Sequence, residues 1–183
     1  IVASLASISL AQGASWEELT KRSISLYRAG RYDEAIPMAR KALEATEAAF
    51  GPDHPMVAKS LNNLAQMYTS RGEPEKAEPL FERARSLLEK TLGKDHPDIA
   101  PTLNNLAGLY MDEGRYAEAE SLYEKALSIR EKSLSPDHPD VATSLNNLAV
   151  LYVRQGQHEK AEPLYQRALS IREKALGKND PDV

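Results

Sequence analysis

The chain contains no cysteine among its 183 residues, and this absence excludes several kinds of protein. Without cysteine there is no disulfide framework, no thiolate nucleophile and no thiolate metal site. A basic excess is also lacking, because the formal net charge is −4, whereas nucleic-acid-binding domains normally present a basic face. No stretch holds the roughly 18 uninterrupted apolar residues of a membrane span. We therefore expect neither nucleic-acid binding nor a stable membrane span.

The sequence also lacks the common signatures of a catalytic site. It has no glycine-rich phosphate loop, no Ser-His-Asp spacing and no HExxH helix. Carboxylates such as Glu78 and Glu82 are numerous, but they alternate with cations such as Lys76 and Arg83. Mixed charge of this kind is typical of a solvated helix face. We expect a protein that is not an enzyme and that has no catalytic residues, no metal site and no cofactor.

An internal repeat dominates the sequence. The segment that starts at Ala58 and contains Leu-Asn-Asn-Leu-Ala recurs from Ala100 and from Ala142, at intervals of 42 residues. A weaker copy precedes these three. Self-similarity at a fixed period is the signature of a repeat architecture. The expected repeats are a degenerate copy over 15–57 and regular copies over 58–99, 100–141 and 142–183.

Each copy has the periodicity of two helices. Leu61 and Leu64 belong to an apolar stripe with helical spacing, and Gly72 follows it as a helix-ending residue. A second stripe of the same kind begins with Ala77 and Phe81. The sequence therefore predicts an all-α fold in which every repeat is an antiparallel pair of helices.

Short polar signals mark the expected helix ends. Ser15 followed by Glu18 is a capping box that opens the first helix. Asp95, two residues before Pro97, is the candidate N-cap of a later helix. Pro79 lies near the start of a second helix, where few backbone hydrogen bonds are lost.

The spacing of small and large residues resembles the tetratricopeptide repeat. The matching positions of one copy are Leu61, Leu64, Ala65, Tyr68, Ala77 and Phe81. The 42-residue length, with its Leu-Asn-Asn-Leu-Ala and Asp-His-Pro-Asp segments, is similar to the kinesin-light-chain type of this repeat. The resemblance covers residues 16–183. It implies a right-handed superhelical solenoid of antiparallel helix pairs, with a concave groove that binds short peptides through asparagines.

The first copy departs from this pattern. Arg22 stands where Leu64 stands in the next copy, and Leu26 replaces Tyr68. We expect the first copy to be a cap or a worn repeat rather than a full contributor to binding.

The histidines recur with the repeat. His54, His96 and His138 lie one repeat apart, and Asp180 takes the matching position in the last copy. Packed helices are roughly 10 Å apart, so two of these imidazoles are too distant to bind one metal ion at about 2 Å each. We expect them to be turn residues at helix entries, and the lone His158 to be structural as well.

The paired asparagines are the best candidates for a binding site. At about 100° per residue, Asn62 and Asn63 lie on the side of their helix opposite the apolar stripe of Leu61, Leu64 and Tyr68. Each side-chain amide has a donor and an acceptor, as a peptide bond does, so a ladder of amides can bind the backbone of an extended segment. The candidate groove residues are Lys59, Asn62, Asn63, Gln66, Ser70, Asn104, Asn105, Asp112, Thr143, Asn146, Asn147 and Arg154.

Two interpretations of the asparagines remain open. Either one amide of each pair contacts a ligand, with Asn63, Asn105 and Asn147 favoured, or the amides bond neighbouring repeats and fix their packing. Lys59 and Arg154 are the only basic residues placed in the groove by this reasoning, so a strong preference for acidic peptides does not follow.

The sequence thus predicts a non-catalytic protein-interaction scaffold that binds an extended peptide segment of a protein partner. The alternative is a structural array that self-associates through open repeat ends. Such an array would space domains of a larger protein, or regulate an enzymatic domain elsewhere in it.

Residues 1–14 allow two interpretations. An apolar run that ends in Ser9-Leu10-Ala11 resembles a signal-peptide cleavage site, which favours an exported protein, periplasmic or secreted. The same run also fits a short capping helix with Ile1 and Leu5 on one face, and this leaves a cytoplasmic location open.

Overall fold

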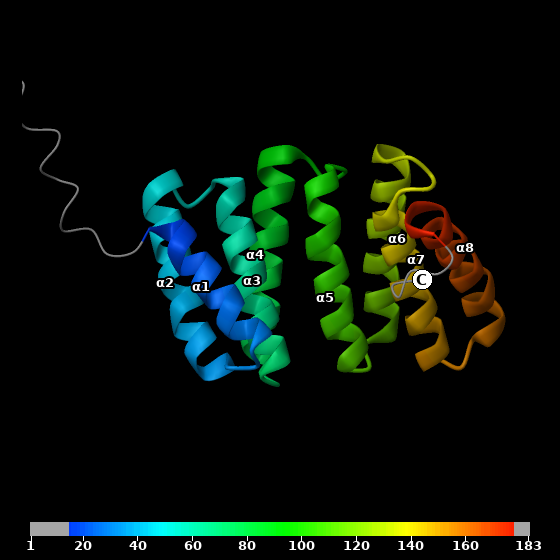
Figure 1. Cartoon of the computed structure of the whole chain (residues 1–183), viewed down its shortest axis with the longest axis horizontal. Helices are drawn as coiled ribbons and strands as arrows, with labels where there is room; N and C mark the ends of the chain where they lie inside the picture. The colour runs from blue at the N-terminus through cyan, green and yellow to red at the C-terminus, as the bar shows by residue number, and fades with distance from the viewer. Residues whose placement is uncertain (1–14, 178–183) are drawn as a thin grey trace, which may run out of the picture. The chain divides into compact units, whose positions relative to one another are not determined.

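The computed structural model describes residues 15–177, and all regular structure in that range is helical. The helices follow one another in pairs joined by short turns (Figure 1). They are α1 (Trp16–Arg28), α2 (Tyr32–Phe50), α3 (Pro55–Ser70), α4 (Pro74–Leu92), α5 (Ala100–Asp112), α6 (Tyr116–Ser133), α7 (Pro139–Arg154) and α8 (His158–Leu176), with the short 3₁₀ helix η1 (Pro97–Ile99) before α5. The expected all-α fold is confirmed. The two interpretations of residues 1–14 concern a segment outside the described residues.

The chain forms two compact units, and the boundary between them falls after Leu80, within α4. In the first unit α1 packs against α2, and α2 packs against α3. In the second unit α5 packs against α6, α6 against α7, and α7 against α8. The first helices of successive pairs also touch, α1 with α3 and α5 with α7. Each unit is therefore built from neighbours in the chain, as in other repeat proteins.

Small side chains lie at the contact between the two helices of a pair. Ala107 of α5 and Ala119 of α6 have no exposed surface, and the rings of Tyr110 and Tyr123 are buried in the same pair. Methyl side chains allow two helix backbones to approach closely, and the larger rings then fill the remaining space to the density of a protein interior. The same arrangement recurs in the next pair, where Ala149 is fully buried.

Histidine rather than aspartate is the N-cap of α3, of η1 and of α7. The Nδ1 atoms of His54, His96 and His138 accept the backbone N–H two residues further on, at 3.1, 3.2 and 3.1 Å. The prediction that these histidines are helix-entry residues is confirmed, but the prediction that Asp95 is the N-cap is wrong. Asp95 instead forms an ion pair with Lys125, which holds the pKa of this exposed carboxyl below its usual value.

Other helix ends follow the sequence signals more closely. Ser15 and Glu18 form the expected capping box, with Ser15 Oγ accepting from the Glu18 N–H at 3.3 Å. The start of α5 differs from those of α3 and α7 because Pro101 is its second residue and has no N–H to donate. The turn before it is accordingly a 3₁₀ turn, in which Ala100 N–H donates to the Pro97 carbonyl.

Candidate peptide-binding site

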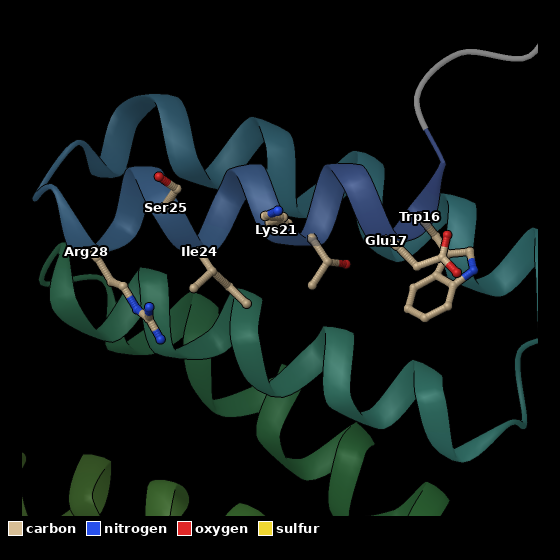
Figure 2. Close-up of a pocket in the computed structure, with 7 residues that line it drawn as sticks. Trp16, Glu17, Lys21, Ile24, Ser25 and Arg28 are labelled. Carbon is tan, nitrogen blue, oxygen red and sulfur yellow. The ribbon is translucent and has the colours of Figure 1, made fainter.

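In the first unit the candidate site lies on α3 and extends onto α1. A hollow of about 570 Å³ lies along α1 (Figure 2), and it is lined by Trp16, Glu17, Thr20, Lys21, Ile24, Ser25 and Arg28. These positions precede by one 42-residue repeat Ala58, Lys59, Asn62, Asn63, Gln66, Met67 and Ser70. The hollow therefore occupies the same face of α1 as the candidate residues occupy on α3. We call this face of a first helix, with its counterparts on α5 and α7, the amide face.

Sequence reasoning missed the α1 residues of the hollow. The first copy lacks the Leu-Asn-Asn-Leu-Ala segment, with Thr20 and Lys21 standing where the asparagines stand later. The signal that could have found them is the 42-residue spacing of the repeat, because Lys21 is the position of the first copy that corresponds to Asn63 in the next. In Figure 2 the side chains of Trp16, Ile24 and Arg28 project from the same side of α1.

The α1 hollow combines apolar surface with charged side chains of both signs. Trp16 and Ile24 are half-buried, whereas Lys21, Arg28 and Glu17 are exposed. The Trp16 ring is steadied by an edge-to-face contact with a ring of α2, Phe50, at 5.3 Å between centroids. The hollow can therefore receive an apolar side chain while its two cations remain in water.

On α3 the candidate residues share the amide face but differ in exposure. Asn62 and Asn63 are half-buried, and Lys59 and Gln66 are exposed. The remaining candidate, Ser70, has its Oγ 3.0 Å from the hydroxyl of Tyr27 on α1. That hydrogen bond joins the ends of the two first helices at one end of this face.

In the second unit the two asparagines of α5 have different roles. Asn104 is 7% exposed, and its Nδ2 donates to Ser144 Oγ on α7 at 3.4 Å. Asn105 is half-buried, and its amide makes no hydrogen bond to any residue in 15–177. The first asparagine thus bonds the neighbouring repeat, and the second leaves its amide groups on the amide face. Asp112, at the end of α5, is exposed.

The α7 candidates divide in a similar way. Asn146 lines a hollow of about 300 Å³ together with residues of α8, whereas Asn147 is half-buried on the amide face. Thr143 and Arg154 are exposed, but the Thr143 hydroxyl donates to the Pro139 carbonyl at 3.2 Å within its own helix. Thr143 is consequently less available to a ligand than Arg154.

Within residues 15–177, no three side chains of the usual metal-binding types lie together. Burial raises the pKa of Tyr123 to about 12, and burial with a hydrogen bond to Glu120 does the same for Tyr152. Both tyrosines lie in the cores of helix pairs.

None of the described helices combines the length and the hydropathy needed to cross a membrane.

The sequence and the fold are similar to known repeat proteins. The tetratricopeptide repeat family matches residues 19–90, 57–110 and 98–174, which together make up most of the chain. No curated protein matches the sequence. Among solved structures, BtubC (BKLC) from P. vanneervenii is 25% identical, with a TM-score of 0.78 over 95% of this chain and 70% of that chain.

Two further structures extend the comparison. A putative kinesin light chain of Podosopora anserina, with nearly identical TPR-like repeats, is 26% identical with a TM-score of 0.76, over 90% of this chain and 78% of that one. A Rap protein complexed with Competence and Sporulation Factor is 17% identical with a TM-score of 0.74, over 87% and 43% of the two chains, and shows the fold alone. The chain belongs to the tetratricopeptide repeat family, with all-α superhelical repeats of the kinesin-light-chain-like type.

Proposed function

We propose that this protein is a non-catalytic interaction scaffold that binds an extended peptide segment on the amide faces of its first helices. Tetratricopeptide repeats generally serve as interaction modules that bind other proteins, and this chain consists mostly of such repeats. The proposal adds a ligand class and a surface to that general role.

The observation behind the proposal is the different placement of the two asparagines on α5. Asn104 already donates to the next repeat, whereas the amide of Asn105 has no partner among the described residues. A half-buried amide with a donor and an acceptor matches the hydrogen-bonding groups of a peptide backbone. Asn63 and Asn147 are half-buried at the matching positions of α3 and α7. An extended segment that bonds to such amides is bound largely through its backbone.

Within the first unit, the α1 hollow adds side-chain contacts to the recognition of a backbone by the amides of α3. Its apolar part, Trp16 and Ile24, can take one apolar side chain of the segment. Burial of such a side chain contributes about 1.5–3 kcal/mol to affinity before the costs of ordering.

The test replaces Asn63, Asn105 and Asn147 with Ala together. Short peptides are first selected from a displayed random library with the unmodified chain, and the best peptide is then titrated into each variant by calorimetry. Each backbone hydrogen bond lost should cost about 0.5–1.5 kcal/mol, so the triple variant should bind at least about tenfold more weakly. Circular dichroism should show unchanged helicity.

The matched control replaces Ser86, Ser128 and Ser170 with Ala. These serines also recur every 42 residues, but they lie on the second helices α4, α6 and α8. Peptide affinity should be unchanged in the control. A library that yields no binding peptide, or a selected peptide that binds the asparagine variant as tightly as the unmodified chain, would contradict the proposal.

A further inference from the structure

A glycine, Gly108, interrupts the side chains of the amide face on α5. Its counterpart on α1 is Ile24 in the hollow, and its counterpart on α3 is Gln66. Asn105 lies three residues before Gly108 and Asp112 lies four residues after it, so the three positions follow one line along the helix. At Gly108 no side chain separates the backbone of α5 from a ligand on this face.

Neither the backbone nor the packing requires a glycine at this position. Gly108 is not among the glycines with a positive φ. A Cβ added to it would have the Tyr123 hydroxyl as its nearest neighbour, at 3.4 Å, which is an ordinary contact. Glycine inside a helix is less stable than alanine. A residue that departs from a local rule without a structural need is often part of a functional site.

The hydroxyl beside Gly108 lacks a partner within the protein. Tyr123 is 3% exposed, and its hydroxyl forms no hydrogen bond to any residue in 15–177. That oxygen is not one of the fully buried atoms without a partner, so the small exposed part of Tyr123 includes it. Hydroxyls of buried tyrosines usually find a partner. Those of Tyr110 and Tyr152 donate to Glu82 and Glu120, at 3.2 and 3.0 Å.

The polar groups around Gly108 match those of a peptide bond. Burial, together with the charge of Asp112, raises the pKa of Tyr123 to about 12, so the hydroxyl remains a donor at neutral pH. The Asn105 amide oxygen and the Asp112 carboxylate are acceptors. A carbonyl oxygen of an extended segment can therefore accept from Tyr123 while a neighbouring N–H donates to Asn105 or Asp112.

A glycine beside a tyrosine occurs in one copy of the repeat alone. The pairs at the two corresponding positions of the other copies are Ile24 with Ala39, Gln66 with Phe81, and Val150 with Tyr165. The following helix α7 packs against both α5 and α6, so the opening at Gly108 exists with the next repeat in place. An amide that recurs in three repeats does not determine which part of a segment lies on which helix, whereas a feature of one repeat does.

We propose that Gly108 and the Tyr123 hydroxyl fix the register of the bound segment on the amide face. The main chain of the segment comes nearest to α5 at Gly108, and one of its carbonyl oxygens accepts a hydrogen bond from the Tyr123 hydroxyl. The inference rests on the proposed function, since it concerns the same peptide backbone that the asparagines bind.

Gly108→Ala separates peptide binding from stability. Its methyl group would occupy the space of the nearest main-chain atoms, so the peptide selected from the displayed library should bind at least about tenfold more weakly in calorimetry. The same methyl group should raise the midpoint of thermal unfolding, because alanine favours the helix. Gly114→Ala, in the turn after α5, is the matched control. It should lower the midpoint and leave the affinity for the peptide unchanged.

Tyr123→Phe removes the hydroxyl and keeps the ring. The affinity for the selected peptide should fall by about three- to tenfold, the effect of one hydrogen bond. Tyr152→Phe is the control, since its hydroxyl already donates to Glu120, and it should bind the peptide as the unmodified chain does.

A series of peptides identifies the carbonyl that Tyr123 binds. Each main-chain amide of the selected peptide is replaced in turn by an ester, whose carbonyl oxygen is a weaker acceptor. At one position the ester should weaken binding to the unmodified chain more than binding to Tyr123→Phe, which is the coupling expected of two groups in contact. A general disturbance of the fold would affect all positions alike.

The results distinguish this inference from the proposed function. Unchanged affinity in Gly108→Ala, or an ester series without coupling to Tyr123 at any position, overturns the inference, and the proposed function stands if the asparagine variant still binds more weakly. Affinity that depends on Tyr123 but not on the asparagines supports the inference and contradicts the role proposed for the asparagines. A chain that binds no peptide overturns both.

Discussion

Arg130 Nη1 lies 2.9 Å from Ser144 Oγ, and this hydrogen bond joins one repeat to the next across the α6 and α7 contact. The Arg130 side chain is largely buried, and burial lowers the pKa of its guanidinium from the usual value, an effect that Asp140 opposes. One repeat earlier the same position is Leu88, and two repeats earlier it is Thr46; both are buried. A single position of the repeat is therefore filled by a cation, an aliphatic side chain and a hydroxyl.

Replacing Arg130 with Leu should change the free energy of unfolding by less than about 1 kcal/mol. The variant loses two hydrogen bonds but also removes the cost of a buried charge, and such replacements are often neutral. Arg130→Ala, which leaves a cavity as well, should cost about 3 kcal/mol. Urea denaturation measures both. Arg172→Ala is the control, with a loss below about 0.5 kcal/mol expected for a half-exposed side chain; equal losses for the Leu and Ala variants of Arg130 would contradict this account.

Gly108 and Gly114 should respond oppositely to alanine. Gly108 lies inside α5, and an added Cβ would meet its nearest neighbour, the Tyr123 hydroxyl, at 3.4 Å, an ordinary contact. Alanine there should raise the free energy of unfolding by about 0.5–1 kcal/mol. Gly114 has a φ of +75°, a conformation that alanine adopts only with strain. Alanine there should lower the free energy of unfolding by about 1 kcal/mol. Thermal denaturation of the two variants in parallel compares them, and a destabilised Gly108→Ala would show that the Tyr123 hydroxyl cannot move aside.

The histidine N-caps should be replaceable by another cap but not by alanine. His138→Ala removes the acceptor of the Asp140 N–H and should cost about 1 kcal/mol of stability. His138→Asn keeps a side-chain acceptor at a preferred N-cap position and should stay within about 0.5 kcal/mol of the unmodified chain. Chemical denaturation gives both values. His158, which is the first residue of α8 and not its N-cap, serves as the control position for alanine.

Alkaline pH should weaken the fold through Tyr123. Burial raises its pKa from 10.0 to about 12. Because the folded-state value is the higher one, the stabilisation is fully present below pH 10 and is lost as the pH rises through 12. The shift corresponds to at most about 3 kcal/mol. Tyr123→Phe should show a shallower decline of stability across this window, measured by urea denaturation at successive pH values.

The repeat and its helices could be predicted from the sequence because their signals are local. Ser15 and Glu18 lie one turn apart, and the apolar stripe around Leu64 has a helical period that no other element shares. The N-cap was assigned wrongly because Asp95 and His96 are adjacent polar residues and both can accept a hydrogen bond. The choice between them depends on which residue adopts the extended backbone before the helix, and that is His96.

The candidate site was less predictable because it depends on contacts between repeats. Asn104 and Asn105 are about 100° apart on the helix and share its polar side. The way in which α5 packs against α7 decides which of the two amides faces the next repeat. The period of the sequence gives no information on this packing. The α1 hollow was missed for another reason. Trp16 and Ile24 differ in type from Ala58 and Gln66, the residues at the same positions of the next repeat. The correspondence between them is one of position alone.

The three chemistries found at the position of Arg130 mean that the repeats are not interchangeable. Thr46 meets a serine, Ser60, at 3.1 Å, whereas Arg130 needs both the Ser144 hydroxyl and a main-chain oxygen of the following helix. If a repeat were moved elsewhere in the chain, the side chain at this position would therefore face a following helix that lacks its hydrogen-bonding partners. The order of the repeats is in this way encoded at their junctions, and shuffled versions of the chain should assemble less stably than the natural order.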